Sequence, residues 1–134
     1  MMKKILFLLL ISCLSKLCFS QDNAFYNLYF EGNAFLAKGQ FEQAIEKYNK
    51  AIKTFEAPYA YYNRGNAYYG KKDLAKALLD YNKTITLNPS YAEAYLQRGL
   101  IKTSTGDKTG CDDLKKAVKL DMPDAKETFK ARCK

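Results

Sequence analysis

The side chains that most often carry out covalent or metal chemistry are scarce in this sequence. The chain of 134 residues contains four cysteines, Cys13, Cys18, Cys111 and Cys133, and no histidine. The absence of imidazole excludes histidine-based triads, acid–base catalysis by imidazole and most zinc and haem sites. The two cysteines of the C-terminal half supply too few zinc ligands unless carboxylates complete the set. We therefore expect no metal and no cofactor.

Two other motifs could act on a substrate, but neither has the arrangement that catalysis needs. Asp112 and Asp113 are adjacent in the sequence, so their side chains diverge on a helix. The stretch "TSTGDKTG", residues 103–110, is only weakly similar to a phosphate-binding loop because it lacks the residue order of a P-loop. An enzyme requires a convergent set of reactive groups. We therefore expect a protein that is not an enzyme.

The first 20 residues have the pattern of a signal peptide. Lys3 and Lys4 precede an apolar run over residues 5–14, and "CFS" places small residues before Gln21. The run is shorter than the roughly 20 residues that a membrane-spanning helix needs, so no membrane span is expected. Cleavage after Ser20 would leave residues 21–134, exported to the periplasm or secreted.

The same segment holds a competing signal. The tetrapeptide "LISC", residues 10–13, resembles a bacterial lipoprotein box and would make Cys13 a lipidated N-terminus. We favour the soluble form because the apolar run before Cys13 is short and the residues after it are still signal-like. Cleavage after Ser20 removes three lysines and no acid, so the formal net charge falls from +8 to +5. A charge of this size, spread through the chain, does not indicate nucleic-acid binding.

Glycine recurs at a fixed interval through the rest of the chain. Gly32, Gly65 and Gly99 are separated by 33 and 34 residues. A large apolar residue stands four positions before each glycine, a small residue twelve after, and a tyrosine or lysine sixteen after. These sets are Leu28, Tyr61 and Tyr95, then Ala44, Ala77 and Cys111, then Tyr48, Tyr81 and Lys115. So many shared offsets indicate an internal repeat.

Each repeat predicts two antiparallel helices. In the second repeat, apolar side chains recur at helical spacing on both sides of the turn-like "GKKD". They are Tyr61, Tyr68, Leu74, Ala77, Leu78, Tyr81 and Ile85, with Gly65 on the same stripe. Asp73 is a good N-cap, and Asn88-Pro89 ends the second helix. We expect Gly65 to lie opposite Ala77, where the lack of bulk lets the two helices approach closely.

These positions resemble the tetratricopeptide repeat. The segment "YNRGNAYYGKKDLAKALLDYNKTITLNP" carries that family's small, aromatic, alanine and proline positions, apart from Thr84, where alanine is usual. The segment "FEGNAFLAKGQFEQAIEKYNKAI" matches nearly as well. The resemblance implies an all-α, right-handed superhelix of three helical hairpins, at about residues 25–57, 58–91 and 92–123. In such a superhelix the first helices line a concave groove that holds a peptide or protein segment.

The third repeat departs from the pattern in a way that predicts the end of the array. Lys102 and Lys115 stand where the earlier repeats have aromatic residues, so this unit is less apolar. Phe129 and Cys133 continue the 34-residue spacing from the third repeat. Because the last apolar face of a solenoid has no successor, we expect a capping helix over about residues 124–132.

Cys111 and Cys133 then occupy the two small-residue positions, which face neighbouring helices. Loss of the signal peptide would leave only these two cysteines, in a compartment that is oxidising. We expect a disulfide between Cys111 and Cys133. The alternative is a pair of free cysteines that act as small core residues.

The helical phase predicts which side chains line the groove. Tyrosine offers a wide amphipathic contact area, and asparagine can hydrogen-bond a peptide backbone without selecting a side chain. The expected lining is Tyr26, Tyr29, Asn33, Leu36, Tyr59, Tyr62, Asn63, Asn66, Tyr69, Glu93, Leu96, Gln97 and Leu100. The same tyrosines and asparagines could instead be ordinary fillers of such repeats.

Some members of the tetratricopeptide repeat family have a specialised function that the residues of this sequence do not support. Members that clamp the C-terminal carboxylate of cytosolic heat-shock chaperones use two asparagines and several cations. Asn33 and Asn63 align with the asparagines, but Tyr29, Glu93 and Gln97 stand at basic positions. A carboxylate would lack charge-assisted partners there, so we expect a different protein or peptide partner.

Two alternative functions remain open. The N-terminal hairpin presents an aromatic face with no preceding repeat to cover it: Phe25, Tyr26, Leu28, Tyr29 and Phe30. This face could make the protein a structural one that associates with itself as a homo-oligomer. The lipoprotein box instead predicts a lipid-anchored accessory protein.

Overall fold

The computed structural model describes residues 23–133, and every regular element within that range is an α-helix. The expected signal peptide, the lipoprotein box and the first two cysteines lie outside the described residues. A helix over residues 23–37 is followed by α2 (Phe41–Thr54), α3 (Pro58–Gly70), α4 (Leu74–Leu87), α5 (Ala92–Ser104), α6 (Gly110–Lys119) and α7 (Ala125–Arg132).

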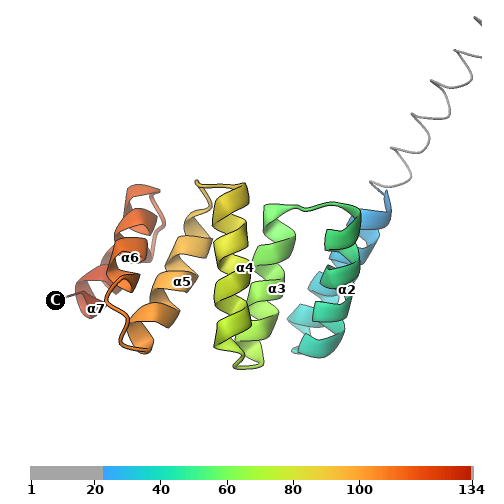
Figure 1. Ribbon diagram of the computed structural model, residues 1–134, viewed down its shortest axis with the longest axis horizontal. Helices are drawn as coiled ribbons and strands as arrows, with labels where there is room; N and C mark the ends of the chain where they lie inside the picture. The colour runs from blue at the N-terminus through green and yellow to red at the C-terminus, as the bar shows by residue number, and fades with distance from the viewer. Residues whose placement is uncertain (1–22, 134) are drawn as a thin grey trace, which may run out of the picture.

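The helices pack in the order in which they occur in the chain. Helix α3 pairs with α4 and α5 with α6, while α2 contacts α3 and α4 contacts α5, so that successive hairpins stack (Figure 1). Helix α7 packs on α6 at the C-terminal end. The all-α solenoid predicted from the repeat spacing is confirmed.

The turn inside each hairpin has one backbone structure that recurs three times. One residue takes the left-handed conformation, and the next N–H donates to the carbonyl oxygen five residues earlier, as in a Schellman helix end. The left-handed residues are Gly39 (φ 70°), Lys72 (φ 63°) and Gly106 (φ 82°). The three N–H donors are Gln40, Asp73 and Asp107, each 2.9 Å from its acceptor.

The close approach inside a hairpin occurs at a tyrosine ring and not at an alanine. A Cβ on Gly65 would lie 2.8 Å from the ring of Tyr81, and one on Gly32 would lie 2.6 Å from the ring of Tyr48. The residues closest to Gly65 are therefore Tyr81 and Asp80, and not Ala77 as expected. Ala77 is fully buried with Ile101 of the next hairpin, so its small size serves the packing between hairpins.

The third hairpin has a shifted register that the sequence spacing did not predict. Leu114, and not Lys115, takes the position of the earlier tyrosines, with its side chain 2.9 Å from a Cβ built on Gly99. Lys115 is exposed, and Gly110 fills the small-residue position expected for Cys111. The cause is that the segment between the turn and the small residue is one residue shorter. Gly110 follows Asp107 by three residues, whereas Ala77 follows Asp73 by four.

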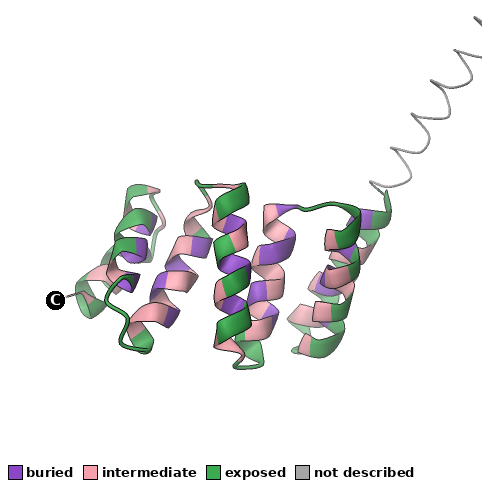
Figure 2. Cartoon of the chain, in the orientation of Figure 1, coloured by how far each residue is buried: buried purple, intermediate pink, exposed green. Residues whose placement is uncertain are grey.

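The C-terminal end of the array is closed by α7. Ala125 is fully buried against Leu96, Leu114 and Ala117, and Phe129 packs on the same cluster. Figure 2 shows the contrast between α7, which is largely exposed, and the buried stripes of α3, α4 and α5. A helix with one apolar face and one polar face is what the end of a solenoid requires.

Replacing Lys72 with glycine tests the shared turn. A side chain in the left-handed conformation costs about 1–2 kcal/mol, and the greater unfolded-state entropy of glycine offsets part of the gain. We expect Lys72→Gly to raise the free energy of unfolding by up to about 1 kcal/mol in urea denaturation. Lys38→Gly, at an exposed site of ordinary backbone conformation, should lower it. Equal losses in both variants would contradict the assignment.

Candidate functional site

The first two hairpins bring predicted groove residues into one hydrogen-bonded group. Asn63 of α3 donates from Nδ2 to the hydroxyl of Tyr29 at 3.0 Å and to Oδ1 of Asn33 at 2.9 Å. Tyr48 of α2 donates to the same Asn33 oxygen at 2.7 Å. We call the following half-buried residues the tyrosine–asparagine surface: Tyr29, Asn33, Tyr59, Tyr62, Asn63 and Asn66.

These hydrogen bonds use only part of the hydrogen-bonding capacity of Asn33 and Asn63. An asparagine has two N–H donors and one carbonyl oxygen with two acceptor sites. Within residues 23–133, Asn63 uses its amide nitrogen and Asn33 uses its carbonyl oxygen. The Asn33 amide and the Asn63 carbonyl oxygen thus remain as a donor and an acceptor on two asparagines that are hydrogen-bonded to each other. A peptide backbone requires this combination.

The next hairpin repeats part of the arrangement. Tyr81 of α4, whose ring lies over Gly65, donates its hydroxyl to Oδ1 of Asn66 at 2.7 Å. In the third hairpin Leu114 replaces this tyrosine, and Leu100 stands at the position of Asn66. The polar pair has become an apolar pair, and the surface ends there.

Tyrosine rings of this surface pack against one another and against Tyr91. The rings of Tyr29 and Tyr59 meet edge to face with centroids 4.9 Å apart, and Tyr62 lies 5.0 Å from Tyr91. Burial raises the pKa of Tyr59 to about 12. The Tyr59 hydroxyl therefore stays neutral at physiological pH, where it can both donate and accept hydrogen bonds.

Other predicted lining residues lie elsewhere. Leu96 is 6% exposed within the cluster under α7, and Leu100 packs on that cluster. Both were expected to line the groove, and for Leu96 this is wrong because its side chain is buried in the core, whereas Leu100 is half-buried. Tyr26 and Tyr69 are about half exposed and Gln97 is half-buried. Tyr91, which contacts Tyr62, was missed because it precedes the first residue of α5.

A repeated ion-pair network joins the hairpins, and the sequence analysis did not identify it. Arg64 of α3 makes a two-pronged contact with Asp80 of α4, with Nε to Oδ2 at 2.8 Å and Nη2 to Oδ1 at 2.7 Å. Its Nη1 donates to Oδ1 of Asn49 in α2 at 2.6 Å. Asp80 is only 5% exposed, so water solvates its carboxylate poorly. The charge of Arg64 stabilises the carboxylate in its place.

The other hairpins carry variants of this network. Arg98 pairs with Asp113 and donates to Asn82 at 2.7 Å, which repeats the arrangement one hairpin later. In the first hairpin the charges are exchanged, with Glu31 on the first helix and Lys47 on the second. Their spacing of 33 or 34 residues is the signal by which these residues could have been found.

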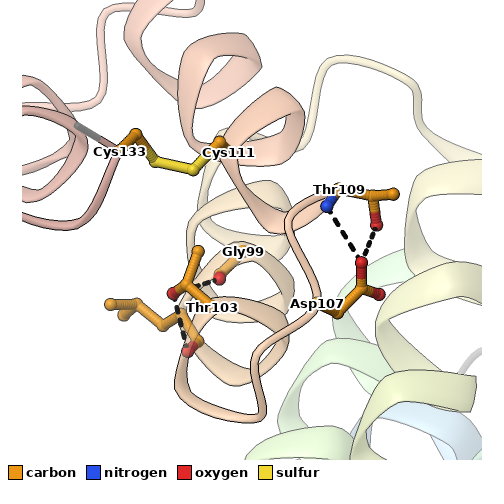
Figure 3. The surroundings of a disulfide bond; sticks show 7 residues. Gly99, Thr103, Asp107, Thr109, Cys111 and Cys133 are labelled. Carbon is orange, nitrogen blue, oxygen red and sulfur yellow. Dashed lines mark hydrogen bonds between the residues drawn. A yellow bond between two sulfur atoms is a disulfide. The ribbon is translucent and has the colours of Figure 1, made fainter.

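A separate cavity of about 570 Å³ lies between the α5–α6 turn, α6 and α7. Its lining includes Cys111, Cys133 and Phe129 but no residue of the tyrosine–asparagine surface. The two cysteines are joined by a disulfide in the structure, with their Cα atoms 5.7 Å apart, a normal separation. Figure 3 shows this bond between α6 and the end of α7.

Residues 23–133 contain no group of three or more histidine, cysteine, aspartate or glutamate side chains placed to hold a metal ion. None of the helices in that range has the length and apolar character needed to cross a membrane.

The family is decided by comparison with known proteins. A tetratricopeptide repeat model matches residues 29–92. The chain contains tetratricopeptide repeats over these residues. The match covers most of the first two hairpins and ends at the first residue of α5, where the hairpin with the shifted register begins. A search of curated proteins found no match.

Solved tetratricopeptide repeat structures share the fold. The first such domain of Spaghetti (RPAP3), bound to the HSP90 peptide SRMEEVD, is 26% identical with a TM-score of 0.76, over 81% of this chain and 90% of that one. The first domain of human RPAP3 is also 26% identical, with a TM-score of 0.73 over 80% and 87%. The Arabidopsis OM64 domain has 23% identity and a TM-score of 0.78 over 84% and 95%.

Removing the negative charge of Asp80 tests the network. Asp80→Asn leaves Arg64 poorly solvated and without its charge partner, and we expect the free energy of unfolding to fall by about 3 kcal/mol. Glu46→Gln makes the same chemical change at an exposed pair with Lys50 and should cost less than about 0.5 kcal/mol. Urea denaturation of both variants measures the difference. Equal small losses would show that the buried pair contributes little.

Proposed function

We propose that this protein is a non-catalytic scaffold that binds an extended segment of a partner protein on the tyrosine–asparagine surface. The observation that carries the proposal is the hydrogen bond from Asn63 to Asn33, which leaves the Asn33 amide and the Asn63 carbonyl oxygen as a donor and an acceptor for a peptide backbone. The tyrosine rings around them provide apolar contact area. A structure of the same fold has been determined with a bound peptide, which supports the use of such a surface.

The ligand differs in charge from the HSP90 peptide SRMEEVD, which is acidic. Tyr29, Glu93 and Gln97 stand where the chaperone-binding members carry cations. An acidic peptide would find no lysine or arginine at these three positions and would meet the negative charge of Glu93. The partner segment is therefore not an acidic chain terminus.

A triple variant tests the surface. We expect Tyr62→Ala, Asn63→Ala, Asn66→Ala to lose the partners that the wild-type protein captures from envelope extracts, because ring contacts and amide groups are removed together. Leu79→Ala, Thr86→Ala, Leu87→Ala on the exposed side of α4 is the matched control and should keep them. Circular dichroism verifies that both variants are folded. A partner list unchanged by the first variant would refute the proposal.

We further propose that the protein is exported and that the Cys111–Cys133 disulfide forms in the oxidising compartment. The signal-like N-terminus and the geometry of the two cysteines support this. Closing a loop of this length stabilises a protein by about 3 kcal/mol in the chain-entropy model. The bond would hold the capping helix on α6.

Mass spectrometry of the protein purified from its envelope tests both statements. We expect an N-terminus at Gln21 and one peptide pair linked through Cys111 and Cys133. A lipid-modified Cys13 would establish the lipoprotein alternative. Two free thiols in the unfolded, unreduced protein would exclude the disulfide.

A second candidate function is self-association through the N-terminal hairpin. The side chains of Tyr26, Phe30 and Phe55 are 48%, 62% and 58% exposed, and Tyr26 stacks on Phe30. Exposed aromatic groups of this kind mark interaction surfaces when they form a patch. Light scattering separates the two candidates, because a strict monomer would exclude this one.

A further inference from the structure

One carboxylate of the first five helices has no ion-pair partner within residues 23–133. Seven acidic residues lie between residues 24 and 106, and six of them have a lysine or arginine nitrogen within 4.0 Å. The six are Glu31, Glu42, Glu46, Glu56, Asp73 and Asp80. The exception is Glu93, an exposed residue in the first turn of α5.

Glu93 lies beside the aromatic end of the tyrosine–asparagine surface. Burial first, and then the negative charge of Glu93, raise the pKa values of Tyr62 and Tyr91. The two rings are 5.0 Å apart and tilted by 38°, and Tyr62 also contacts Tyr81 at 5.8 Å. Tyr91 is the N-cap of α5 and Glu93 lies in its first turn, two residues later, so the carboxylate and the Tyr62–Tyr91 ring pair lie at the junction of the second and third hairpins.

The part of the chain that the structure describes places no cation within ion-pair distance of this carboxylate. Arg98, five residues further along α5, is held by Asp113 and Asn82. Lys102 contacts Asp113 as well, at 3.1 Å. The basic side chains of α5 are therefore directed to α4 and α6, and Glu93 is left for an external cation.

We propose that Glu93, Tyr62 and Tyr91 form a site for a lysine or arginine side chain of the bound segment. This inference rests on the proposed function. Tyrosine faces attract a cation through the ring quadrupole, and a carboxylate adds a charge-assisted hydrogen bond. The recognition is local, since the whole chain carries a formal net charge of +8. A segment with an acid at this position would be repelled.

Selection from a displayed library of random peptides tests the site. We expect peptides selected on the purified wild-type protein to be enriched in lysine and arginine. Glu93→Gln should weaken the binding of the best basic peptide by about fivefold, and Glu93→Lys should select acidic peptides instead. Glu46→Gln, the same change in charge on α2, is the control and should leave affinity unchanged. High salt should reduce the wild-type preference.

A double-mutant cycle tests whether Glu93 contacts the basic residue of the peptide. Replacing the basic residue of the peptide with glutamine should weaken binding to the wild type but have no further effect on Glu93→Gln. Peptides that bind wild type and Glu93→Gln equally, and still lose binding in the triple variant of the surface, would overturn this inference and leave the proposed function standing. If every selected peptide binds the triple variant as well as the wild type, the proposed function fails, and this inference fails with it.

Discussion

The fold and its binding surface both depend on the contact between a helix glycine and the ring of a tyrosine. Gly32 and Gly65 present bare backbone on which the rings of Tyr48 and Tyr81 lie. The hydroxyl groups of the same two tyrosines then reach Asn33 and Asn66. Close packing inside a hairpin thereby sets the orientation of the asparagines. A Cβ at either glycine would move the ring and with it the hydrogen bond to the surface.

The end of the array follows from the loss of this contact. Leu114 takes the place of the tyrosine in the third hairpin, so no hydroxyl reaches the position of Leu100, and both side chains join the core beneath α7. The polar surface stops where the capping helix begins. Glu93 lies at that boundary, next to the last tyrosines, which explains why a charged group is available there while the other carboxylates of the first five helices are paired.

The sequence predicted the elements well because glycine, large apolar and small positions repeat at an interval typical of a helical hairpin. It did not predict the one-residue shift at Gly110, since a periodic count assumes that every turn has the same length. It also placed Leu96 on the surface, because helical phase alone does not show that α7 covers this face. The Arg64–Asp80 network was missed although its spacing repeats, since its first-hairpin counterpart, Glu31 with Lys47, has exchanged charges.

The most direct test of the binding surface is a nitrogen-15 NMR titration of the purified protein with a peptide selected on it. The side-chain amide signals of Asn33 and Asn63, together with backbone signals of α3, should shift as the peptide is added. The signals of the exposed side of α4 should stay in place. Shifts confined to the cavity around Cys111 and Cys133 would place the partner at the other end of the array and contradict the proposed surface.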